Sequence, residues 1–329
     1  MSDSKAEYLP VYLEVISADE VNEFDLYMEN AGTFRLFRHQ SVPITQEDIK
    51  SLMGRNHVKL FVPTSQKDQF YDHMVRKLPK MLQDGSIPPG AKLDLLKETS
   101  SNILERVLAE PSSKPRLQRT VTQCKNHVNL ALQKNSEEKF LTDGRPEVSP
   151  PVAHAINVGN LAILLGLRCG IDEPIQLHCL GVGAILHEIG KRIIDKNYYL
   201  RPEKNTCISN MRFKKYPVIG STMLEKSNVV PTGALRPVME HQERLDGTGY
   251  PNQLKAPQIS IEGRIVAICD YYDENIYANS TRTKKTPFQV LMKMTSATDK
   301  FDRHILVEFI RLLGTNLVED RNRVTATGA

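Results

Sequence analysis

The segment from His241 to Pro251, HQERLDGTGYP, constrains the fold of this chain more than any other stretch. A histidine and an acid end an apolar stretch there, and a loop rich in glycine and proline follows at once. This order is typical of metal ligands held at the end of a helix and joined to a rigid loop. Two more sets of ionisable residues lie in apolar runs, at 187–191 (HEIGK) and at Asp270. Buried polar groups need partners, and a shared metal ion would satisfy all three sets.

Helical periodicity of the apolar residues dominates from Val152 onward, and no later run favours a strand. The helix predicted to open near Pro174 places His187 and Lys191 on one face, with Glu188 able to reach the same site. A buried lysine is costly without an anionic partner, so the sequence favours a shared site. A plain ion pair between Glu188 and Lys191 on the helix is the alternative.

Two more candidate ligands come from other predicted helices. His154 lies among apolar residues, where a lone histidine is more often a satisfied core residue than a ligand. Asp270 ends a run that is too apolar for a surface acid. Nitrogen and oxygen donors without thiolates suit iron, manganese or a similar divalent ion better than a structural zinc.

The order and spacing of five pieces resemble the HD-GYP family, bacterial cyclic di-GMP phosphodiesterases built on a helical metal-dependent phosphohydrolase core. The family pattern has a leading histidine, an HDxGK motif, a His before a Pro-x-x-Gly, an HHExxDGxGYP loop and an aspartate that ends a helical run. The matching positions here are His154, 187–191, 216–220, 241–251 and Asp270.

The resemblance implies a mainly α fold, with an all-helical HD-type phosphohydrolase core over residues 146–329. It implies a di- or tri-iron centre with manganese as a substitute, and we expect two iron ions. The metal ligands that it implies are His154, His187, Glu188, His241, Asp270, Tyr216 and Gln242.

The implied reaction is hydrolysis of cyclic di-GMP by a hydroxide that bridges two metal ions about 3.5–4 Å apart. Glu188 and Lys191 are the implied catalytic residues, and Lys191 offsets the charge that develops on the phosphoryl oxygens. Lys191, Arg282 and Asp246 are the implied substrate-binding residues. A plain structural turn is the alternative for the motif loop, which consists of Gly249, Tyr250 and Pro251.

Four positions depart from the family pattern. Glu188 stands in place of an aspartate, Tyr216 in place of a histidine, and Gln242 in place of the second histidine of a pair. Lys284 stands where the family commonly has a tyrosine.

These departures affect the two metal positions unequally. The better-equipped position keeps a sound ligand set in His154, His187, Glu188 and Asp270. The other position keeps Glu188 and His241 and needs a Tyr216 phenolate and the Gln242 carbonyl to complete it. We therefore expect an atypical member with metal binding and reduced activity. Two alternatives stay open. In the first, the chain is a degenerate module that binds cyclic di-GMP or docks GGDEF-domain diguanylate cyclases through the motif loop. In the second, it is a hydrolase of another phosphate ester.

The N-terminal part is predicted to be separate from the helical core. Residues 1–85 contain short β-favouring runs and a helix start at Thr45, which predict a small α+β regulatory or interaction domain. Residues 86–145 are predicted to form a helical linker and leading helices, either a dimer helix or plain packing helices. His39, His57 and His73 are scattered and form no catalytic set.

Composition limits the partners and the compartment. The net charge of +4 is mild, so it suits a phosphate-bearing ligand but not a nucleic-acid polymer, which usually needs a denser basic stripe. The N-terminus lacks the order of a signal peptide, no apolar run approaches the roughly 20 residues of a membrane span, and the five cysteines form no CxxC pair. We therefore expect a cytoplasmic protein with no membrane span.

Overall fold

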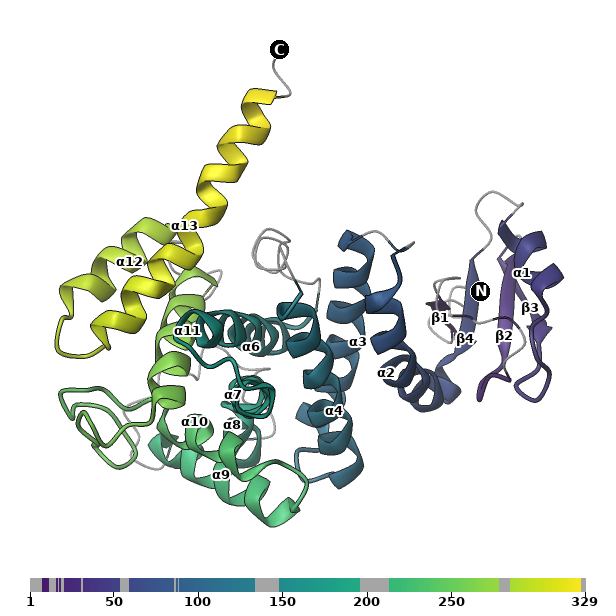
Figure 1. The fold of residues 1–329 in the computed structure, drawn as a ribbon. Helices are drawn as coiled ribbons and strands as arrows, with labels where there is room; N and C mark the ends of the chain where they lie inside the picture. The colour runs from purple at the N-terminus through teal and green to yellow at the C-terminus, as the bar shows by residue number, and fades with distance from the viewer. Residues whose placement is uncertain are drawn as a thin grey trace. The chain divides into compact units, whose positions relative to one another are not determined.

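The chain divides into two compact units, Met1–Pro88 and Pro89–Ala329 (Figure 1). The structure, a computed structural model, describes residues 8–11, 16, 18, 21–30, 32–53, 59–85, 87, 89–133, 148–195, 213–277 and 285–326. The predicted class, a mainly helical protein with a small N-terminal α+β unit, is confirmed.

The N-terminal unit is built on a four-stranded antiparallel sheet in the order β1-β4-β2-β3. Gly32 has a φ of 79° in the tight turn between β2 and β3, a conformation that glycine adopts without strain. Thr45 and Asp48 exchange side chain-to-backbone hydrogen bonds of 2.9 and 3.1 Å at the start of α1, as the sequence predicts. The elements are β1 (Tyr8–Val11), β2 (Leu26–Asn30), β3 (Thr33–Arg38), α1 (Gln46–Met53), β4 (Leu60–Pro63), η3 (Thr64–Gln66) and α2 (Lys67–Gln83).

In the described part of the second unit the regular elements are helices, and the loop after α10 carries an isolated β-bridge between Asp246 and Lys255. Two single turns, η6 (Phe213–Lys215) and η7 (Thr232–Ala234), precede α9 and α10. The helices are α3 (Pro89–Ala109), α4 (Lys114–Ala131), α6 (Pro150–Arg168), α7 (Pro174–Leu186), α8 (Ile189–Ile194), α9 (Tyr216–Ser227), α10 (Leu235–Glu240), α11 (Ile261–Tyr277), α12 (Pro287–Ser296) and α13 (Arg303–Ala326).

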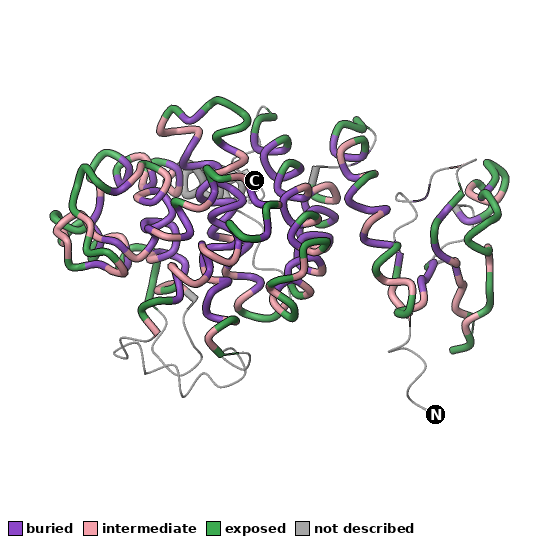
Figure 2. The backbone as a smooth tube through the Cα atoms, turned by 90° about the horizontal axis from the view of Figure 1, so that it is seen from below, coloured by how far each residue is buried: buried purple, intermediate pink, exposed green. Residues whose placement is uncertain are grey.

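Helix α6 forms the middle of this unit, where it packs against α7 and α11 and also contacts α3, α4 and α13. Most residues of α6 are buried, and Figure 2 shows in purple the buried residues of the described chain. By length and composition α6 is apolar enough to cross a membrane, so the expectation that no run approaches that length is wrong. However, 72% of its most apolar window is buried inside the protein, as in the core helix of a helical domain.

The helix predicted to run through Lys191 is interrupted. Helix α7 ends at Leu186, residues 187–188 form a turn, and α8 begins at Ile189. A Cβ on Gly190 would overlap the carbonyl oxygen of Tyr216, so α8 lies directly against the start of α9. His187 therefore lies in the turn and Lys191 on α8, so the two residues do not share one helix face.

Candidate metal centre

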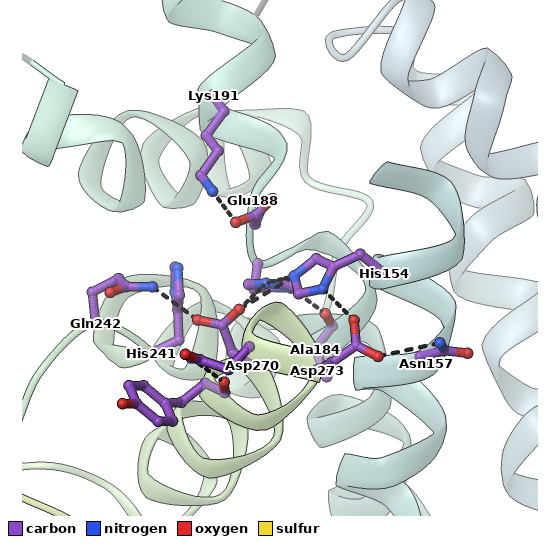
Figure 3. A network of polar contacts seen from close by, with 12 residues as sticks. His154, Asn157, Ala184, Glu188, Lys191, His241, Gln242, Asp270 and Asp273 are labelled. Carbon is purple, nitrogen blue, oxygen red and sulfur yellow. Dashed lines mark hydrogen bonds and ion pairs between the residues drawn. The ribbon is translucent and has the colours of Figure 1, made fainter. Parts of the chain in front are cut away.

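Three segments of the helical unit bring four potential ligands together (Figure 3). His154 comes from α6, His187 and Glu188 from the turn after α7, and Asp270 from α11. One ligand atom from each of these residues lies within 4.8 Å of the others. The structure thus gathers the four residues of the better-equipped position.

Hydrogen bonds behind the two histidines orient both rings. Nδ1 of His154 lies 2.7 Å from Oδ2 of Asp273, and Nδ1 of His187 lies 2.6 Å from the carbonyl oxygen of Ala184. An Nδ1–H that donates to each oxygen leaves the lone pair on Nε2. The two Nε2 atoms face each other 3.3 Å apart.

Asp270 completes a set of atoms that requires a positive charge. Its Oδ1 lies 3.2 Å from Nε2 of His154 and 3.4 Å from Nε2 of His187. Among the described residues this buried oxygen has no hydrogen-bond partner of good geometry. Two nitrogen lone pairs and a carboxylate oxygen at such distances repel one another unless a proton or a metal ion lies between them. The donor set therefore fits a divalent metal ion.

The pKa shifts of the site also fit a bound cation. Burial lowers the pKa of His154, but its close contacts with the carboxylates of Asp270 and Asp273 outweigh burial and raise the pKa well above the usual value. Burial raises the pKa of Asp270, but the two histidines outweigh it and hold the pKa well below the usual value. A bound proton and a bound metal thus compete for the same place.

Glu188 belongs to this cluster and to an ion pair at once. Its carboxylate accepts a hydrogen bond from Nζ of Lys191, and both side chains are largely buried. Burial raises the pKa of Glu188, but Lys191 and His154 outweigh it, so the net pKa is lowered. The two sequence interpretations are therefore compatible, because the ion pair forms inside the site.

His241 lies beside this cluster with both of its nitrogens engaged. Nδ1 lies 2.9 Å from the carbonyl oxygen of Val238, and Nε2 lies 2.7 Å from the hydroxyl of Tyr216. The ring centroids of His241 and His187 are 4.9 Å apart. Burial raises the pKa of Tyr216 well above the usual value, so the hydroxyl donates to Nε2.

Gln242 contacts Asp270 rather than pointing an oxygen into the site. Its Nε2 donates to Oδ2 of Asp270 over 2.8 Å. A carboxylate oxygen accepts only from a donor, so the amide group, not the carbonyl that the sequence suggested as a ligand, faces Asp270.

The motif loop is fastened to the turn after α10. The amide of Tyr250 donates to the carbonyl of Gln242 over 3.1 Å, and the Glu243 carboxylate accepts the amides of Asn252 and Leu254. A Cβ on Gly249 would overlap the backbone of this turn, so only glycine fits there. The loop is therefore a structural turn that also carries a tyrosine beside the site.

The remaining predicted site residues do not belong to the ligand cluster, or lie outside the described residues. Nζ of Lys191 lies 5.0 Å from the ring centroid of Tyr216, and the Tyr250 ring lies 6.3 Å from that of Tyr216. Asp246 accepts two hydrogen bonds from Thr248 and so caps its own turn. Pro251 follows Tyr250 in the loop, and Arg282 and Lys284 lie outside the described residues.

The sequence interpretation missed the role of Asp273. Its position three residues after Asp270 placed both carboxylates on one face of α11, which was the available signal. Asn157 donates to Oδ1 of Asp273 over 3.2 Å, so α6 supplies both the histidine and the residue that steadies its partner.

A pocket of about 360 Å³ adjoins the centre, because Gln242 lines it. The guanidinium of Arg244 lies 5.3 Å from the Phe301 ring centroid, and Nζ of Lys293 lies 5.9 Å from that of Tyr271. Tyr250 and Lys300 also line the pocket. Cations and aromatic rings together suit a ligand that carries both phosphate and an aromatic base.

The HD domain family matches residues 124–305, and the chain belongs to this family. Within it, the predicted relationship to the HD-GYP cyclic di-GMP phosphodiesterases is confirmed by the curated relatives that follow.

Two curated relatives illustrate the relationship. The chain is 27% identical over 161 residues to a cyclic di-GMP phosphodiesterase of Pseudomonas aeruginosa, a match that covers 49% of this chain and 39% of the relative. It is 34% identical over 118 residues to the cyclic di-GMP phosphodiesterase response regulator RpfG of Xanthomonas campestris, over 35% of this chain and 31% of the relative. The chain thus spans well under half the length of either relative.

The fold is similar to that of Bd1817, a HDG"Y"P protein from Bdellovibrio bacteriovorus. The TM-score is 0.61 at 16% sequence identity, and the match covers 94% of this chain and 100% of that chain. At this identity the similarity establishes the fold alone.

Proposed function

We propose that this chain is a metal-dependent phosphodiesterase that hydrolyses cyclic di-GMP to the linear dinucleotide. The observation that carries the proposal is the convergence of His154, His187 and Asp270 on one point. Two nitrogen lone pairs meet there with a carboxylate oxygen that has no hydrogen-bond partner among the described residues. Curated relatives that act on cyclic di-GMP support the substrate. Iron, with manganese as a substitute, is the proposed metal.

A bound divalent metal supplies Lewis acidity toward a phosphoryl oxygen and lowers the pKa of water. The chain itself supplies a buried cation, Lys191, at the edge of the cluster. This ammonium offsets the negative charge that a phosphodiester gains in the transition state. Glu188 holds the ammonium there through their ion pair.

The adjoining pocket accounts for the rest of the dinucleotide. Lys293 and Lys300 attract the second phosphate, and Tyr250, Tyr271 and Phe301 offer ring faces for a guanine. Because these residues do not belong to the ligand cluster, they affect binding more than chemistry.

The test uses the full chain loaded with iron or manganese and follows the linear dinucleotide by chromatography. His187→Ala and Asp270→Ala are expected to lose most of the bound metal and all hydrolysis. Lys293→Ala and Lys300→Ala are expected to raise KM about 10-fold each with kcat little changed, since each loses about one charge-assisted contact. Lys125→Ala, an exposed lysine on α4, is the matched control and should behave as the wild type.

A second candidate function is favoured by the hydrogen bonds of Tyr216 and Gln242, which engage groups that the family uses as ligands. The chain would then bind cyclic di-GMP without turnover. Saturable binding to the metal-loaded protein with an intact dinucleotide after hours would favour this module. A protein that neither binds nor hydrolyses cyclic di-GMP would contradict both functions.

A further inference from the structure

We infer that the centre holds one metal ion, and that the Tyr216 hydroxyl replaces a second metal as the partner of His241. The inference rests on the metal centre of the proposed function but not on its substrate. It differs from the two iron ions that the resemblance implies.

His241 has no lone pair left for a metal ion. Its Nδ1–H donates to the carbonyl of Val238, and its Nε2 accepts the hydroxyl of Tyr216 over 2.7 Å. His154 and His187 differ from it in one respect. Their Nδ1 atoms are engaged in the same way, but their Nε2 atoms face each other and Asp270.

Asp270 likewise has only one carboxylate oxygen placed to bind a metal ion. Oδ1 is the oxygen that points at the two imidazoles, whereas Oδ2 accepts the amide of Gln242 over 2.8 Å. The amide presents N–H groups where a second cation would need an acceptor, and a cation beside an N–H donor is repelled. Tyr216 and Gln242, which replace family histidines, therefore both act as hydrogen-bond donors.

Tyr216 has no space in which to turn away from His241. Its side chain is 1% exposed, and its carbonyl lies against Gly190 at the packed junction of α8 and α9. The Phe213 ring and the Lys191 ammonium lie at 5.4 and 5.0 Å from its ring. A second metal at Nε2 of His241 would thus have to displace a fully buried phenol.

The test counts metal ions and does not depend on turnover. The purified chain is stripped, reloaded with excess Mn²⁺, desalted and measured by elemental analysis, and its Mn²⁺ coupling is read by electron paramagnetic resonance. The wild type should bind one equivalent with the spectrum of isolated Mn²⁺. The double variant Tyr216→His, Gln242→His should bind up to two equivalents with a spin-coupled spectrum.

Tyr216→Phe is the control, because it removes the hydroxyl and adds no ligand, and it should stay at one equivalent. Two coupled Mn²⁺ ions in the wild type, or none, would overturn the inference. If circular dichroism shows that the double variant does not fold, the number of metal ions bound by the wild type still tests the inference. One equivalent without hydrolysis would leave this inference standing and contradict only the proposed reaction.

Discussion

Asp273 holds the imidazole of His154 from the side opposite the metal centre. The carboxylate oxygen and Nδ1 are 2.7 Å apart, and the two residues lie 119 positions apart in the chain. Asp273 is 1% exposed and also accepts the amide of Asn157. The contact therefore connects α6 to α11 and directs the lone pair of His154 toward Asp270.

Loss of this contact should weaken metal binding without removing a ligand. Removing the partner behind a metal-binding histidine typically costs about 10–100-fold in metal affinity. Asp273→Ala should therefore bind Mn²⁺ about 10–100-fold more weakly, measured by competition with a chelator. Glu262→Gln on the same helix is the matched control, and an equal loss in both variants would contradict the assigned role.

The state of Tyr216 can be read from the colour of the protein. A phenolate bound to ferric iron gives a visible charge-transfer band. Burial raises the pKa of Tyr216, and its proton is used in the hydrogen bond to His241, so the oxidised iron-loaded protein should lack that band. The check is a visible absorption spectrum of the wild type beside Tyr216→Phe. A band present in the wild type and absent from the variant would show that Tyr216 binds iron.

Buried His127 should make the helical unit less stable in weak acid. It contacts Ser100 and Asn160 over 2.7 Å each, and burial lowers its pKa from 6.5 to about 4. Below pH 6.5 the unfolded chain binds a proton that the folded chain does not, so stability falls as the pH drops from about 6.5 to about 4 and is unaffected above.

The size of this effect follows from the two pKa values. Between about pH 7.5 and about pH 5 the loss should be roughly 2 kcal/mol. Urea unfolding at the two pH values measures it. His127→Asn should be less stable at both, but with a smaller difference between them. Equal differences in the two proteins would show that His127 does not titrate in this way.

Much of the candidate site could be predicted from local patterns in the sequence. His154, His187 and Asp270 could be selected because each interrupts an apolar helical run, and a buried ionisable group needs a partner wherever the chain goes. Thr45 and Asp48 could be recognised as a helix start because a cap involves only near neighbours. Such features need no knowledge of the tertiary structure.

Contacts between distant segments could not be predicted. The break at His187 precedes a close approach of Gly190 to Tyr216, and the apolar periodicity of one helix carries no information about a neighbouring helix. The donor roles of Tyr216 and Gln242 depend on which atoms face them after folding. A homodimer through residues 86–145 and docking of GGDEF-domain proteins stay predictions.

The most direct measurement of the whole account is the rate of cyclic di-GMP hydrolysis as a function of bound metal. Stripped protein is titrated with iron or manganese from zero to two equivalents, and linear dinucleotide is quantified at each step. The account predicts no product without metal, a rate that rises linearly to one equivalent, and a plateau beyond it. A rate that appears only between one and two equivalents, or no product at any loading, would contradict it.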